Sequence, residues 1–148
     1  MALVRLVEES EATGLVKEVY LDIMTSRKLA KVPNYWKALA NQPAVLAVTW
    51  EKLKTVMAEG ALDRRTKEII AVAVSATNNC DYCLQSHTDA LRSLGLGDAE
   101  LVELLAVVDF FNGSNAMASG LKVEYAPPVR REEEGPPERA SASAKEGT

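Results

Sequence analysis

Residues 69–76 (IIAVAVSA) form a run that is apolar on nearly every side. Because periodicity alone does not separate a buried helix from a buried strand in so short a run, the flanking residues decide between them. Lys67 and Glu68 lead into the run without a turn, and Asp63 is placed to cap a helix that begins just after it. We therefore predict a helix. A helix that is apolar all round must be covered all round, so we expect it at the centre of the domain or in a subunit interface.

The rest of the chain also has the spacing of helices, and no segment alternates convincingly as a strand does. The fold class predicted is therefore all-α. The expected helices cover residues 11–29, 34–41, 43–59, a segment that follows Asp63, 79–94 and 98–121, with Gly60 and Gly95 as C-terminal caps. In the short helix over residues 34–41, the side chains of Tyr35, Trp36 and Leu39 are expected to face inward.

The chain has 148 residues, the length of one domain, and its hydrophobic share of 47% is ample for a packed core. From residue 126 onward the composition changes to proline pairs, an acidic run and a final stretch of small and polar residues. Such a composition cannot bury enough apolar surface to offset the entropy lost on ordering. We predict a helical domain over residues 1–125 and a disordered or loosely docked tail over residues 126–148.

The charge pattern and the missing motifs exclude several classes of function. The net charge is -4 and no block rich in lysine and arginine stands out, so we expect no nucleic-acid partner. The N-terminal apolar run is too short for a secretory signal, and no later stretch reaches about 18 uncharged apolar residues, so we expect a cytoplasmic protein with no membrane partner. A glycine-rich phosphate loop, a Ser-His-Asp set and paired catalytic carboxylates are all missing, which argues against nucleotide chemistry and hydrolysis.

Both cysteines and the only histidine of the chain stand within eight consecutive residues, as Cys80, Cys83 and His87. In a helix these positions lie at i, i+3 and i+7, so two sulfurs and an imidazole share one stripe. The preceding residues 78–79, both asparagine, are expected to start this helix, and the positive end of a helix dipole favours a thiolate there. The stretch therefore indicates thiol chemistry.

Plainer interpretations of the same residues stay open. Cys80 and Cys83 also suit two small buried residues, and with His87 they offer three ligands to zinc. No second CxxC or HxxxH completes a closed four-ligand site, so we expect no metal and no cofactor. His87 alone would suit the surface or the core, and Glu68 would suit an ordinary ion pair with Arg64 at i-4. Proximity to the helix start favours Cys80 as the reactive thiol, whereas the i+4 spacing from His87 favours Cys83.

The pattern of Glu68, eleven residues, Cys80-Asp81-Tyr82-Cys83, three residues and His87 resembles the AhpD-like branch of the carboxymuconolactone decarboxylase superfamily. The resemblance implies an all-helical subunit with the CxxC at the N-terminus of a helix, assembled as a homotrimer or homohexamer. It also implies a thiol peroxidase that takes electrons from a lipoylated protein. By this resemblance Cys83 attacks the peroxide, Cys80 resolves the product, and His87 with Glu68 belongs to a proton relay. The decarboxylase branch lacks the cysteine pair, so decarboxylation is not expected.

The chain departs from the best-known members of that branch at Tyr82, where they carry a second histidine. Tyrosine is a weak base near neutral pH, with an ordinary pKa of about 10, but it can pass a proton or position water. We expect a cysteine-based peroxidase or disulfide reductase whose substrate is a hydroperoxide or a disulfide and whose donor is a lipoylated or other dithiol. The alternative is an oligomeric redox sensor or binding module that uses the same CxxC without turnover.

Overall fold

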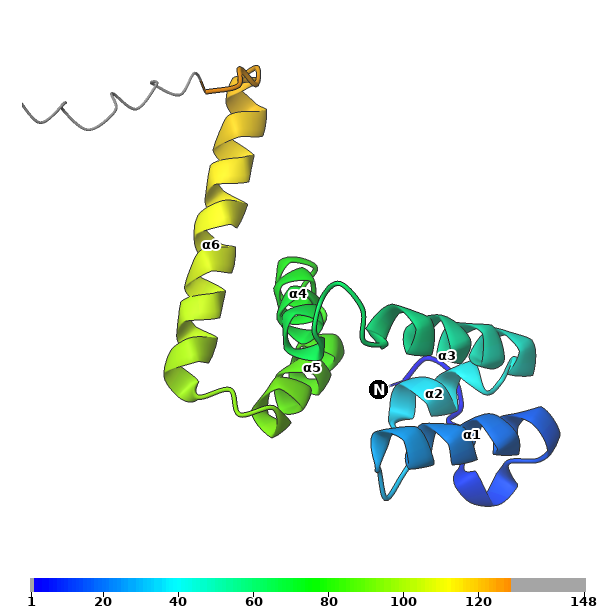
Figure 1. Ribbon diagram of the computed structural model, residues 1–148. Helices are drawn as coiled ribbons and strands as arrows, with labels where there is room; N and C mark the ends of the chain where they lie inside the picture. The colour runs from blue at the N-terminus through cyan, green and yellow to red at the C-terminus, as the bar shows by residue number, and fades with distance from the viewer. Residues whose placement is uncertain (1, 129–148) are drawn as a thin grey trace, which may run out of the picture. The chain divides into compact units, whose positions relative to one another are not determined.

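The computed structural model describes residues 2–128, and in that range all the regular secondary structure is helical (Figure 1). The prediction of an all-α fold is therefore confirmed. A 3-10 helix, η1 (Glu9–Glu11), precedes α1 (Gly14–Arg27), α2 (Asn34–Leu39), α3 (Pro43–Met57), α4 (Arg64–Thr77), α5 (Asp81–Ser93) and α6 (Asp98–Leu121). Residues up to Phe110 form one compact unit, and a second unit begins at Phe111. From residue 129 onward the tail expected over residues 126–148 lies outside the described residues.

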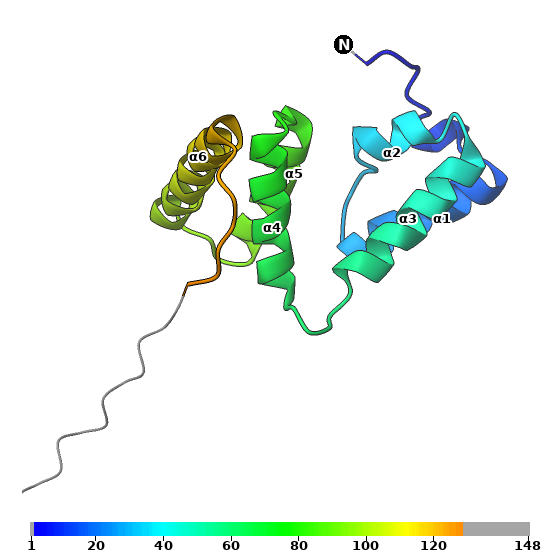
Figure 2. The same cartoon turned by 90° about the horizontal axis from the view of Figure 1, so that it is seen from above.

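Helices α1, α2 and α3 share one hydrophobic core, and Figure 2 shows α1 and α3 side by side. Their buried side chains include Val16, Val19, Tyr20, Ile23, Trp36, Leu46 and Trp50. The indole rings of Trp36 and Trp50 meet edge to face with centroids 5.3 Å apart, a favoured aromatic geometry. The inward orientation expected for Tyr35 is wrong, because this side chain is 45% exposed. Tyr35 instead contacts α5, as described below.

Helices α4 and α5 pack closely as an antiparallel pair around a second, smaller core (Figure 2). The fully buried side chains of Val72 and Leu91 form its centre together with Leu96. The helical interpretation of residues 69–76 is confirmed, since they lie within α4. In a single subunit only one side of this segment is covered, because Ile70 and Val74 are 48% and 53% exposed. Apolar surface therefore remains on the outer face of α4.

The ends of α4 and α5 follow the sequence in part. The side chain of Asp63 accepts a hydrogen bond of 2.6 Å from the backbone N–H of Thr66, which confirms the predicted N-cap. Gly95 follows α5 with a φ of +89°, the left-handed conformation that a helix C-terminus favours. The start expected for α5 at residues 78–79 is wrong. Asn78 ends α4 and Asn79 takes a φ of +53° in the connecting turn, so Cys80 becomes the N-cap of α5.

The C-terminus of α3 also differs from the prediction, because its cap is Ala58 and not Gly60. The carbonyl groups at a helix C-terminus have no partner inside the helix and must find one elsewhere. The ammonium group of Lys67, from α4, donates hydrogen bonds to the carbonyl oxygens of Val56 and Ala58. A side chain from the following helix thus satisfies the end of α3 in place of a glycine turn.

Helix α6 is the longest element and continues past Gly113 to Leu121, as predicted. Leu101, Leu104 and Leu105 near its start pack against the core between α4 and α5. Within residues 2–128, α6 is also the one helix long and apolar enough to cross a membrane by length and composition alone, and none of that span is buried. A core or interface helix of a soluble protein meets the same criterion.

Candidate active site

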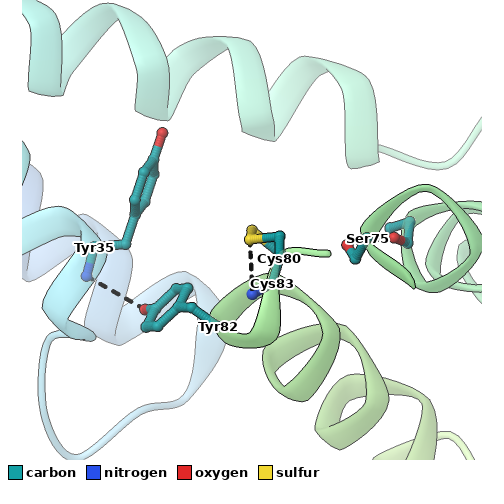
Figure 3. The surroundings of a disulfide bond; sticks show 6 residues. Tyr35, Ser75, Cys80, Tyr82 and Cys83 are labelled. Atoms are coloured by element: carbon teal, nitrogen blue, oxygen red, sulfur yellow. Dashed lines mark hydrogen bonds between the residues drawn. A yellow bond between two sulfur atoms is a disulfide. The ribbon is translucent and has the colours of Figure 1, made fainter. Parts of the chain in front are cut away.

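The two cysteines lie at the first turn of α5 and are joined as a disulfide (Figure 3). Cys80 is the N-cap, and its sulfur accepts a hydrogen bond of 3.3 Å from the backbone N–H of Cys83. The backbone N–H of Cys80 donates to the carbonyl oxygen of Ser75, which ties the start of α5 to the last turn of α4. A helix N-terminus presents unpaired amides and partial positive charge, so it stabilises a thiolate when the pair is reduced.

His87 and Glu68 come together where α5 packs on α4. Nδ1 of the imidazole lies 2.7 Å from Oε2 of Glu68, whose side chain is almost fully buried. When the carboxylate is ionised, Nδ1 carries the proton that it shares with Glu68, which leaves Nε2 of a neutral ring as the available base. The structure therefore brings Glu68 and His87, which the sequence offered as partners, into direct contact.

Glu68 also receives the guanidinium of Arg64 on its other oxygen. Nε and Nη2 of Arg64 lie 2.9 Å and 2.7 Å from Oε1. Burial alone would raise the pKa of Glu68, but hydrogen bonds from His87 and Arg64 outweigh burial, so its pKa lies below the ordinary value. The ion pair with Arg64 and the contact with His87, which the sequence offered as alternatives for Glu68, thus coexist.

A pocket of about 410 Å³ lies in front of these groups. Cys83, Glu68 and His87 all line it, whereas Cys80 is not among its lining residues. The opposite side of the pocket comes from the first three helices and is largely apolar, with Trp36, Leu53, Val56 and Met57. Its volume falls within the range of small-molecule sites. Of the two sulfurs, the one next to His87 in the helix therefore borders the space where a substrate fits.

Tyr82 links the cysteine helix to α2. Its hydroxyl oxygen accepts a hydrogen bond of 3.3 Å from the backbone N–H of Tyr35, and the two rings lie with centroids 6.3 Å apart (Figure 3). Tyr35 is the second residue of α2, and the first N–H groups of a helix have no partner inside it. Tyr82 supplies that partner and lines the pocket. Nothing in the sequence around Tyr35 indicated this contact, which joins residues 47 positions apart.

Across residues 2–128, no group of three or more histidine, cysteine, aspartate or glutamate side chains is arranged to hold a metal ion. The three ligands that the sequence offered to zinc are used otherwise in this structure. Cys80 and Cys83 are bonded to each other, and Nδ1 of His87 faces Glu68.

The comparisons with known proteins agree with the sequence pattern. Residues 43–123 match the carboxymuconolactone decarboxylase family. A solved structure described as the alkylhydroperoxidase AhpD core of Rhodospirillum rubrum is similar with a TM-score of 0.81 and 43% identity, covering 85% of this chain and 95% of that one.

Two curated relatives have enzyme names. An alkyl hydroperoxide reductase of Mycobacterium tuberculosis is 28% identical over 122 residues, which cover 80% of this chain and 35% of that protein. An (R)-2-haloacid dehalogenase of Pseudomonas putida is 30% identical over 116 residues, which cover 78% of this chain and 38% of that protein. The chain thus spans little more than a third of either relative. From the family match and the AhpD core structure together, the chain belongs to the carboxymuconolactone decarboxylase family and, within it, to the AhpD-like branch.

Proposed function

We propose that this protein is a cytoplasmic thiol peroxidase that reduces hydroperoxides through a dithiol/disulfide cycle of Cys80 and Cys83. The observation that carries the proposal is the position of Cys83, which lines a pocket together with the buried pair of Glu68 and His87. The relatives named as an alkylhydroperoxidase and as an alkyl hydroperoxide reductase support the same chemistry. We propose a homotrimer or homohexamer as the working assembly.

In the first step the thiolate of Cys83 attacks one oxygen of the hydroperoxide. A sulfur–oxygen bond forms as the oxygen–oxygen bond breaks, and the leaving alkoxide takes a proton to become an alcohol. The sulfur of Cys83 is thereby oxidised by two electrons to sulfenic acid. His87 stands one turn further along α5, so Nε2 is suited to take the thiol proton and to return it to the leaving oxygen.

In the second step Cys80 resolves the sulfenic acid. Its sulfur attacks the sulfur of Cys83, the disulfide forms, and the hydroxide that leaves takes a proton to become water. The disulfide between these residues is the product of that step. A dithiol donor then supplies two electrons and two protons, becomes a disulfide itself and restores both thiols. We propose a lipoylated protein or another dithiol as the donor.

Glu68 is proposed as the positioning partner of His87 in this relay. Its carboxylate fixes the imidazole with Nδ1 inward, and Arg64 keeps the buried carboxylate ionised. The carboxylate behind the ring fixes which nitrogen carries the proton and leaves Nε2 as the acceptor for the thiol proton. The proton thus passes from Cys83 to His87 and then to the leaving oxygen, while Glu68 stays ionised.

Peroxide turnover with a dithiol reductant tests the proposal. The full chain is reduced, freed of reductant and titrated with one equivalent of cumene hydroperoxide, and we expect the loss of two thiols and the release of cumyl alcohol. Added dihydrolipoamide should then sustain many turnovers. The control is the double variant Cys80→Ser, Cys83→Ser, which has no thiol left to oxidise. Loss of the thiols without sustained turnover would favour the alternative of a redox sensor, and thiols that do not react at all would exclude both.

A further inference from the structure

The charged groups of the 410 Å³ pocket are unevenly balanced. Its lining includes Arg27, Lys52 and Arg64, and Glu68 is its one acidic member. That carboxylate already receives both Arg64 and His87. Among residues 2–128, neither the side chain of Arg27 nor that of Lys52 forms an ion pair or a hydrogen bond. The pocket therefore keeps two uncompensated positive charges in a chain whose net charge is -4.

The two cations come from helices of the first core, whereas the cysteines belong to the start of α5. Arg27 is in the last turn of α1 and is half-buried, and Lys52 is on α3. The pocket lining also includes the apolar side chains of Trp36, Leu53, Val56 and Met57. A ligand with a carboxylate at one end and a hydrocarbon chain matches this combination of surfaces, because guanidinium groups bind carboxylates and apolar side chains bind hydrocarbon.

We infer that the pocket binds organic hydroperoxides that carry a carboxylate, with the carboxylate at Arg27 and Lys52 and the hydroperoxide group at Cys83. The inference rests on the proposed function and names its substrate class. A neutral peroxide gains only the apolar contacts, and hydrogen peroxide gains neither kind. The same cations attract anionic substrates toward the pocket, an effect that salt screens.

Paired substrates test the charge preference directly. A hydroperoxyoctanoic acid and its primary amide present the same chain and the same peroxide group, and differ only in the charge at one end. We expect kcat/KM for the acid to exceed that for the amide by about tenfold, the ratio expected from one hydrogen bond to a charged group. Raising the ionic strength should shrink the ratio. Equal kcat/KM values for the two substrates at low salt would overturn the inference.

Substitutions at the two cations test whether they bind the carboxylate. Arg27→Gln and Lys52→Gln should each lower the ratio of acid to amide, and the double variant should bring it close to one. Lys17→Gln is the matched control, because Lys17 is an exposed cation on the same helix as Arg27 and does not line the pocket. If the double variant keeps the ratio of the unaltered protein, the carboxylate does not bind at these two residues and the inference is wrong.

A binding measurement separates this inference from the proposed function. Octanoate and octanamide are titrated into the full oxidised protein by calorimetry, which requires no turnover. Binding of octanoate about tenfold tighter than octanamide, lost in the double variant, supports the site even if no hydroperoxide is reduced. In that case the proposed peroxidase function is wrong and the carboxylate site is supported. If both peroxides are turned over but octanoate and octanamide bind equally, the proposed peroxidase function is supported and the carboxylate site is wrong.

Discussion

The carboxylate of Glu68 lies 2.7 Å from Nδ1 of His87 and joins α4 to the helix that carries both cysteines. The contact is buried on the side of the carboxylate and open to the pocket on the side of the imidazole. It therefore fixes one ring nitrogen and leaves the other available.

Replacing His87 by glutamine should slow peroxide reduction near neutral pH. Without the imidazole, the pKa of the Cys83 thiol rises and less thiolate is present, so we expect kcat/KM to fall by about 10²-fold or more. The pH–rate profile of the reduced protein measures both effects. Gln85→Ala serves as the control on the exposed face of the same helix. If the His87→Gln profile matches that of the unaltered protein, His87 is structural and the relay is wrong.

Glu68 should make folding stability depend on pH in the acid range. Its pKa in the folded protein is lowered by His87 and Arg64, against the opposing effect of burial. A lowered folded pKa contributes stability that is present above the unfolded value of about 4.3 and is lost as pH falls through the folded value. Urea unfolding near neutral pH and in mild acid should therefore show a smaller acid loss for Glu68→Gln than for the unaltered protein.

The control for this experiment is Glu103→Gln, which removes an exposed carboxylate on α6. Its acid dependence should follow that of the unaltered protein. The Glu68→Gln variant is also expected to be less stable at neutral pH, because Arg64 loses its charged partner. An acid dependence that is unchanged in Glu68→Gln would contradict the lowered pKa.

The two cysteines should differ in their reaction with peroxide. Cys80→Ser should keep a reactive thiol and accumulate sulfenic acid at Cys83, because no resolving thiol remains. Cys83→Ser should react slowly, since Cys80 does not line the pocket. Dimedone trapping followed by peptide mass spectrometry identifies the oxidised sulfur. Sulfenic acid at Cys80 of the Cys83→Ser protein, formed at the rate of the unaltered protein, would reverse the assignment.

Tyr82→Phe should loosen the link between α5 and α2 without removing the ring. The change leaves the backbone N–H of Tyr35 without the hydroxyl acceptor that it has at 3.3 Å, at a cost of about 0.5–1.5 kcal/mol in the free energy of unfolding. Urea unfolding measures this cost. Tyr35→Phe is the control, because it removes a hydroxyl from the neighbouring ring and keeps the backbone N–H. Equal stability of Tyr82→Phe and the unaltered protein would show that the hydrogen bond contributes nothing.

Assembly should depend on α6 and not on the tail. Val102, Val107 and Met117 of α6 are 68%, 54% and 66% exposed in one subunit, and burial of such surface yields about 25 cal/mol per Å². We expect light scattering to give the same number of subunits for a chain ending at Tyr125 as for the full chain. Val102→Lys combined with Val107→Lys should weaken the assembly. A truncated chain that stays folded and active as a monomer would overturn the proposed trimer or hexamer.

Several local features followed from the sequence because their causes act over a few residues. Apolar spacing predicted the helices, and Asp63 predicted the start of α4. Gly95 predicted the end of α5, and its left-handed conformation agrees with that role. The same short range explains the error at the start of α5. Asparagine suits both a helix N-cap and the left-handed conformation, and Asn79 adopts the second, which leaves Cys80 as the cap.

What only the tertiary structure decided are the contacts between distant residues. The sequence alone placed Cys83 and His87 one turn apart on one helix, because helical geometry fixes positions four apart. The expected stripe of three residues is not complete, because Cys80 precedes α5 as its N-cap and does not line the pocket. The sequence did not decide whether Glu68 pairs with Arg64, with His87 or with both, because His87 reaches it only through the packing of α5 on α4. The contact of Tyr82 with Tyr35 and the cations of the pocket depend likewise on how apolar faces pack across the fold. Those faces bring helices together without any local pattern that records which polar groups will meet.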